Sequence, residues 1–103
     1  MADAGRIWKA VGLDRIGLSL MSYRLLIDSE VLDFAFSLSK AHQCRLFHEF
    51  STIKKYPHNC SDFVVQDKLG RTLQVDLWED YQIRYWIDDA DQHIKILALV
   101  ENE

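Results

Sequence analysis

Residues 71–100, RTLQVDLWEDYQIRYWIDDADQHIKILALV, contain three runs rich in apolar side chains, separated by polar segments at 79–80 and 89–92. In the first run, one face of an extended chain carries the apolar residues Leu73, Val75 and Leu77. The other face carries polar residues and a tryptophan: Thr72, Gln74, Asp76 and Trp78. Residues 81–88 alternate with the same period of two, and 93–100 form the last run. Short serial runs joined by tight turns predict an antiparallel meander of strands.

The segment before this meander predicts one strand followed by two helices. Residues 23–27 are short and apolar, and Asp28 or Ser29 can cap a helix over 30–39, where apolar residues recur at helical spacing. Ser39 can cap a second helix over 40–56, which Pro57 ends. Residues 62–67 form a further strand that turns at Gly70. We therefore expect an α+β fold, in which an N-terminal α-helical hairpin packs on one face of an antiparallel sheet and leaves the other face partly open.

The first twenty residues differ from the rest of the chain. They contain three of the four glycines, and Asp14-Arg15 interrupts their apolar residues, which argues against a signal peptide. Three interpretations of residues 1–20 stay open: a disordered extension, a short amphipathic helix, or a segment that precedes a natural start at Met21. Residues 21–103 are expected to form the domain itself.

Composition excludes several classes of protein. The 103 residues fit one small domain, and 49% apolar residues with 12% aromatics are too many for a disordered chain. Two cysteines are too few for a disulfide scaffold, and no apolar run is long enough to cross a membrane. The net charge of −4 disfavours non-specific binding to nucleic acid. We expect a cytoplasmic protein that has no membrane partner, no small-molecule substrate and no cofactor.

Two stretches of the chain carry a resemblance to a known family. Residues 70–89, GRTLQVDLWEDYQIRYWIDD, followed by HIKILAL at 93–99, resemble the double hairpin of the RelE/ParE superfamily of toxins from bacterial type II toxin–antitoxin systems. Residues 23–38 resemble the opening strand and first helix of that family. The similarity covers about residues 21–100 and implies the α+β fold expected above. It also implies a cognate antitoxin protein, whose tail wraps the toxin.

The resemblance implies two modes of growth inhibition. RelE-like members cut mRNA in the ribosome, and ParE-like members inhibit DNA gyrase without cutting anything themselves. The family's RNA-cleaving members place basic residues on the open sheet face, where this chain has Gln74 and Asp76, and they have Arg where this chain has Gln82. The basic, aromatic tail of those members is also missing from residues 99–103. We therefore expect no efficient RNase chemistry. If the chain does cleave RNA, Arg84 and Arg71 are the remaining candidates for the catalytic cations.

The open face is expected to bind a partner instead. Trp78, Trp86, Arg84 and Gln82 are assigned to this face, where the two indoles and the guanidinium suit a docked protein segment. A metal site is not expected. The residues His42, Cys44, His48, His58 and Cys60 lack zinc-ligand spacing, and the acidic turn at 88–91 lacks the glycine and glutamate of a calcium loop.

The leading functional hypothesis is a toxin-like protein that is neutralised by a cognate antitoxin and inhibits growth by binding a macromolecular target, in the manner of ParE toxins. The first alternative is a ribosome-dependent mRNA endoribonuclease, and the second is a non-toxic interaction module. The candidate partners are thus an antitoxin, DNA gyrase, or the ribosome with its mRNA.

Overall fold

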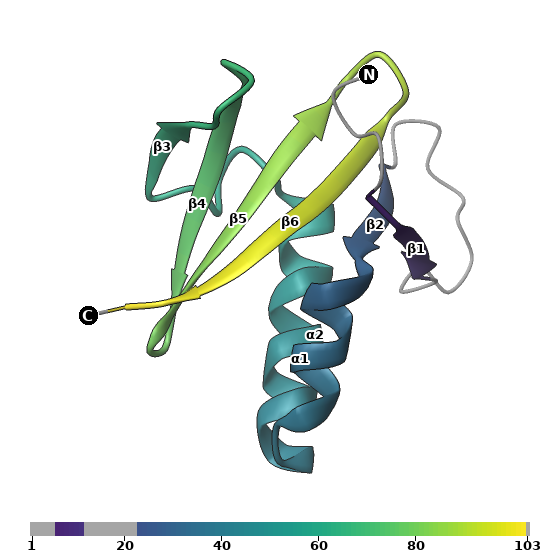
Figure 1. The fold of residues 1–103 in the computed structure, drawn as a ribbon, viewed down its shortest axis with the longest axis vertical. Coiled ribbons are helices and arrows are strands. Elements are labelled where there is room, and N and C mark those ends of the chain that lie inside the picture. Colours follow the sequence, from purple (N-terminus) through teal and green to yellow (C-terminus); the bar gives the residue numbers. More distant parts are fainter. Residues whose placement is uncertain (1–5, 12–22, 103) are drawn as a thin grey trace.

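The computed structural model describes residues 6–11 and 23–102 (Figure 1). These residues form an α+β fold with one six-stranded sheet and two helices. The strands are β1 (Trp8–Val11), β2 (Arg24–Asp28), β3 (Phe63–Gln66), β4 (Thr72–Trp78), β5 (Tyr81–Asp88) and β6 (His93–Glu101). The helices are α1 (Ser29–Ser37) and α2 (Lys40–Lys55). None of the described helices is long and apolar enough to cross a lipid bilayer.

The strands lie in the order β1-β2-β6-β5-β4-β3 across the sheet. The antiparallel meander predicted for the C-terminal half is confirmed, because β3, β4, β5 and β6 pair antiparallel with their neighbours in sequence. The expectation of a wholly antiparallel sheet is wrong, because β2 pairs parallel with β6. The alternation of side chains within a strand shows which residues share a face. It does not show whether a strand from a distant part of the chain pairs with it parallel or antiparallel.

Both helices begin at side-chain caps. Asp28 accepts a hydrogen bond from the backbone N–H of Glu30 at 2.9 Å, and Ser39 accepts one from the N–H of His42 at 3.3 Å. These are two of the capping positions predicted from the sequence. Helix α2 ends at Lys55, just before Tyr56 and the buried Pro57.

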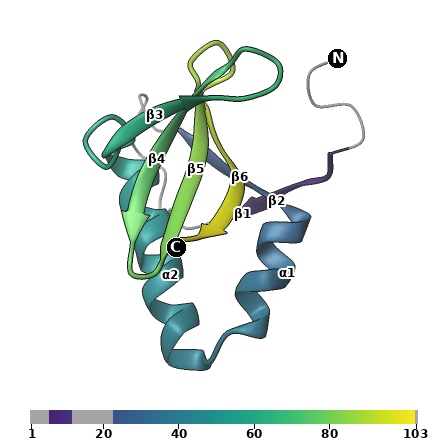
Figure 2. The same cartoon turned by 60° about the vertical axis from the view of Figure 1, so that its left-hand side comes forward.

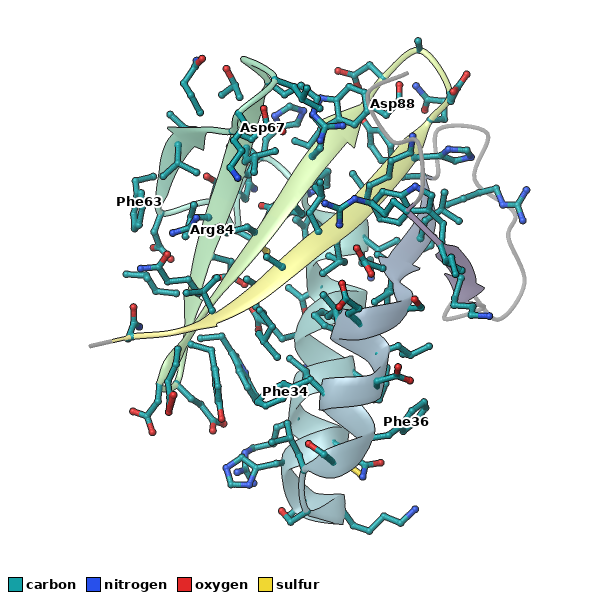
Figure 3. All side chains as sticks on the ribbon, in the orientation of Figure 1. Phe34, Phe36, Phe63, Asp67, Arg84 and Asp88 are labelled. Carbon is teal, nitrogen blue, oxygen red and sulfur yellow. The ribbon has the colours of Figure 1, made fainter. Side chains whose placement is uncertain are left out.

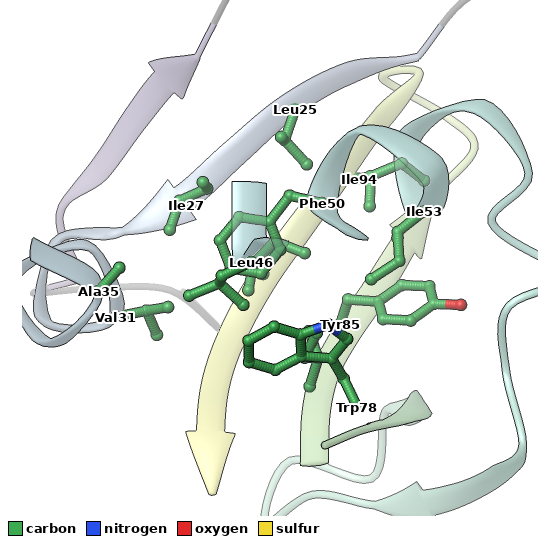
Figure 4. Packing of buried hydrophobic residues seen from close by; sticks show 12 residues of the cluster. Leu25, Ile27, Val31, Ala35, Leu46, Phe50, Ile53, Trp78, Tyr85 and Ile94 are labelled. Carbon is green, nitrogen blue, oxygen red and sulfur yellow. The ribbon is translucent and has the colours of Figure 1, made fainter. Parts of the chain in front are cut away.

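The two helices cover one face of the sheet, here called the inner face (Figures 1 and 2). The hydrophobic core lies between them and the sheet, where Leu46, Phe50 and Ile53 of α2 are fully buried. Figure 4 shows these side chains packed among residues of β2, β5 and β6, including Ile27, Tyr85 and Ile94. The opposite face, here called the outer face, carries neither of the two helices that the described residues form.

Strand β1 lies within the first twenty residues. It pairs antiparallel with β2 at the edge of the sheet, and the backbone N–H of Ser29 donates to the carbonyl of Ile7 at 2.9 Å. Residues 8–11 are thus a strand, which none of the three interpretations of residues 1–20 includes. The remainder of the segment, residues 1–5 and 12–22, lies outside the described residues.

Candidate functional site

The outer face of the sheet brings together three of the four residues assigned to partner binding. Residues that are directly opposite on paired strands share a face. One such row crosses the sheet through Leu77, Gln82 and Val100, and the next passes through Phe63, Val75, Arg84 and Ala98. Trp86 lies in a third row beside Lys95. Gln82, Arg84 and Trp86 are therefore neighbours on alternate positions of β5, as the alternation predicts.

Side-chain amides hold the guanidinium of Arg84 in place. Gln82 Oε1 accepts hydrogen bonds from Arg84 Nη2 at 2.9 Å and from Nε at 3.3 Å. Gln82 Nε2 in turn donates to Asn102 Oδ1 at 3.0 Å. This chain of contacts runs from the end of β6 to the centre of β5 and fixes the half-buried guanidinium on the outer face.

Two cations lie against Trp86. The guanidinium of Arg71 and the ammonium of Lys95 each lie 5.0 Å from the centre of its ring. Each cation also forms an ion pair, Arg71 with Asp67 at 2.8 Å and Lys95 with Asp88 at 3.3 Å. The indole and its cations thus form a layer that covers part of the outer face with the chain's own side chains.

The layer continues to strand β1. Lys95 lies 5.7 Å from the ring of Trp8, and the guanidinium of Arg6 lies 5.4 Å from the same ring. Arg6 also forms an ion pair with Asp28 and donates to the carbonyl of Leu97 at 3.2 Å. Arg6 thereby ties the N-terminal segment to both β2 and β6.

We expect Arg6→Gln to lower the free energy of unfolding by about 1 kcal/mol, because Asp28 is buried and loses a charged partner. Urea denaturation at neutral pH measures the change. Lys9→Gln is the matched control, since Lys9 lies in the same segment and is exposed. Equal stability of the two variants would show that Arg6 does not anchor β1.

Trp78 lies on the inner face, so its assignment to the open face is wrong. It is directly opposite Tyr81 and belongs to the hydrophobic core, with 9% of its surface exposed. The two rings stack with their centres 6.1 Å apart. The alternation in β4 correctly separates the residues of one face from those of the other. Both sets contain apolar side chains, so the alternation alone does not show which set is buried. The partners on β5 show which set faces the helices: Asp76 lies opposite the buried Ile83, and Gln74 lies opposite the buried Tyr85.

The same reversal places Asp76 inside the protein, whereas the sequence predicts it on the open face. Only 5% of Asp76 is exposed, and its Oδ2 atom has no hydrogen-bond partner among the residues that the structure describes. Burial, a side-chain hydrogen bond with Glu49 of α2, and the negative charges of Glu49 and Asp62 raise the pKa of Asp76 to about 8. The raised pKa favours the protonated form of Asp76, in which the carboxyl group shares a hydrogen bond with Glu49.

Two further titratable groups belong to this buried cluster. Burial raises the pKa of the Cys60 thiol to about 11, and the charges of Asp76, Glu49 and Asp62 act in the same direction. Burial also raises the pKa of Tyr85, whose hydroxyl donates to the carbonyl of Pro57. Both groups are therefore neutral and unreactive at neutral pH, as expected of structural side chains.

A potential group of metal ligands lies at the β5–β6 turn. Ligand atoms of Asp88, Asp91 and His93 lie within 4.8 Å of one another. The ammonium of Lys95 already neutralises Asp88 on the outer face, and the backbone N–H of Asp91 donates to Asp88 Oδ1 at 3.3 Å. The turn is therefore held together by its own contacts. Figure 3 shows the position of Asp88 at the end of β5.

The candidate functional site is thus the outer face around Arg84, bordered on one side by the layer of Trp86 and its cations. In comparisons with known proteins, no family model, no curated protein and no solved structure matches this chain.

Proposed function

We propose that this chain is a toxin-like protein of the RelE/ParE type, which inhibits growth by binding a macromolecular target and is neutralised by a cognate antitoxin. The observation that carries the proposal is the outer face around Arg84, which neither α1 nor α2 covers and which presents a fixed guanidinium beside apolar side chains. The order strand, two helices, meander agrees with the family resemblance of residues 21–100.

The electrostatics of the outer face favour inhibition without RNA cleavage. Cleavage of RNA needs cations that stabilise the charge developing on the phosphate. Arg71 and Lys95 are engaged with Asp67 and Asp88, and Arg6 is engaged with Asp28. Arg84 alone of these four cations is held by a neutral amide. An RNA phosphate that approached three of these four cations would therefore be repelled by the carboxylate beside each of them.

The same balance of charge favours a protein target. The net charge of −4 opposes the approach of nucleic acid, whereas an apolar surface with one fixed cation suits a protein segment. Of the two targets that the family resemblance implies, DNA gyrase is thus preferred over the ribosome with its mRNA. Inhibition of gyrase would require a cytoplasmic location.

Induced expression of the full chain in a bacterial host is expected to stop growth within a few generations. Primer extension on total mRNA should show no new cleavage sites, and a DNA-damage reporter should be activated. Codon-phased cuts in the mRNA would instead establish the RelE-like nuclease. Undisturbed growth, with the protein shown to be folded and abundant, would leave the non-toxic interaction module as the function.

A further inference from the structure

The guanidinium of Arg84 has one edge occupied and one edge free of any carboxylate of the described chain. An arginine offers five N–H donors in a planar fork. Gln82 Oε1 takes the edge formed by Nε and Nη2, which leaves the edge formed by Nη1 and Nη2. That end-on edge matches the two oxygens of a carboxylate, and such bidentate pairs are among the strongest hydrogen-bonded contacts in proteins.

Exposed apolar side chains lie near Arg84 on the outer face. Leu77 and Val100 lie in the row next to Arg84, and they are 47% and 36% exposed. Phe63 lies in the same row as Arg84, on the far side of Val75, and is 42% exposed. Figure 3 shows Phe63 and Arg84 toward the β3 side of the sheet, away from helix α1, which carries Phe34 and Phe36. One charge among apolar groups is typical of a docking surface rather than of a solvated one.

We propose that this surface, the Arg84 patch (Phe63, Leu77, Gln82, Arg84 and Val100), docks a peptide segment of a partner protein in which one Asp or Glu side chain is flanked by apolar side chains. The carboxylate binds the free edge of the Arg84 guanidinium, and the flanking side chains cover Leu77, Val100 and Phe63. This inference rests on the proposed function, because it states the chemistry of the partner that covers the outer face.

Charge complementarity selects this occupant. Arg71, Lys95 and Arg6 have carboxylate partners in Asp67, Asp88 and Asp28, so a single anionic group, rather than a row of phosphates, matches what this part of the face offers at Arg84. The end of the described chain is fixed at the border of this surface, where the Asn102 side chain accepts a hydrogen bond from Gln82. The backbone N–H of Asn102 donates to the carbonyl of Asp80 at 2.7 Å, and Glu101 lies opposite Tyr81 on the inner face.

A random library of twelve-residue peptides displayed on phage tests the proposal on the immobilised full chain. We expect the recovered peptides to carry an Asp or Glu between apolar residues. Their binding should fall about tenfold or more on Arg84→Gln, because that variant loses the charged fork. Arg84→Lys should give an intermediate loss, because an ammonium keeps the charge but not the planar fork.

Arg24→Gln is the matched control, because Arg24 is an exposed arginine on the same face, two strands away from Arg84 on β2. It should bind the recovered peptides as the unmodified chain does. Thermal unfolding of all three variants verifies that they are folded.

Three results would overturn the proposal: recovery of no peptide above background, recovery of peptides without an acidic residue, or binding that Arg84→Gln leaves unchanged. Binding of a fluorescent RNA oligonucleotide that depends on Arg84 would also overturn it, in favour of a nucleic-acid surface. The proposed function is tested separately. A folded chain that binds the acidic peptides but does not stop growth would support the docking surface and contradict the toxin function.

Discussion

Asp76→Asn is expected to raise the free energy of unfolding by about 1–3 kcal/mol at pH 9 and to leave it nearly unchanged at pH 4. The reason is that Asp76 is buried, faces Glu49, and has an Oδ2 atom to which no described residue donates a hydrogen bond. Ionisation of Asp76 would place a second negative charge beside Glu49, within reach of Asp62. Asparagine has nearly the same shape, donates to Glu49 through its amide, and cannot ionise.

The sign of this pH dependence follows from the raised pKa. An unfolded Asp titrates near about 3.9, whereas the pKa of Asp76 in the folded protein is about 8. Between these values the folded state binds the proton and the unfolded state does not, so alkali favours unfolding. The contribution of protonated Asp76 is fully present below about pH 4 and is lost as the pH rises through about 8. The Cys60 thiol and the Tyr85 hydroxyl stay neutral through this window, because burial raises the pKa of both.

Urea denaturation at intervals from pH 4 to pH 9 measures the difference between the variant and the unmodified chain. This difference isolates Asp76, because every other carboxyl group titrates in both proteins. Asp33→Asn is the matched control, since Asp33 is exposed on α1, and we expect it to change stability by less than about 0.5 kcal/mol at every pH. A destabilised Asp76→Asn at pH 9 would mean that the carboxylate is ionised and paired in the folded protein.

The sequence predicts local structure here far better than it predicts which side of a strand is buried. Both helices can be located from the sequence because their end signals act on neighbouring backbone groups. These signals are the capping residues Asp28 and Ser39 and the proline that follows α2. The strands of the meander follow from alternation and tight turns, which are also local. The parallel pairing of β2 with β6 depends on a contact between segments about seventy residues apart along the chain, which no local pattern contains.

The candidate site shows the same division. Gln82, Arg84 and Trp86 are correctly grouped, because residues two apart on one strand share a face wherever the strand lies. Whether that face also includes Trp78 depends on the register between β4 and β5, which is a tertiary property. An aspartate at position 76 suggests a solvated face, and the buried carboxyl cluster around Asp76 forms only because Glu49 and Cys60 are brought there by α2 and the loop after it.

The two tryptophans that the sequence assigns to one face are expected to respond very differently to truncation. Trp78→Ala should lower the free energy of unfolding by about 3–5 kcal/mol, because it removes a large buried ring from the core. Its stacking on Tyr81, which in turn meets the ring of Phe34 edge-on at 5.8 Å, is lost with it. Trp86→Ala should cost only about 1–2 kcal/mol, because it removes cation–π contacts with Arg71 and Lys95 while both cations keep their carboxylate partners.

Urea denaturation of both variants at neutral pH measures the contrast, and Trp78→Phe provides a folded comparison if the alanine variant does not fold. Binding of peptides to the Arg84 patch separates stability from recognition. Trp78→Phe should bind as the unmodified chain does, because the ring at position 78 lies on the inner face, whereas the patch lies on the outer one. Equal and small losses of stability for both alanine variants would place Trp78 on the outer face, and they would contradict the pairing of β4 with β5 on which the Arg84 patch depends.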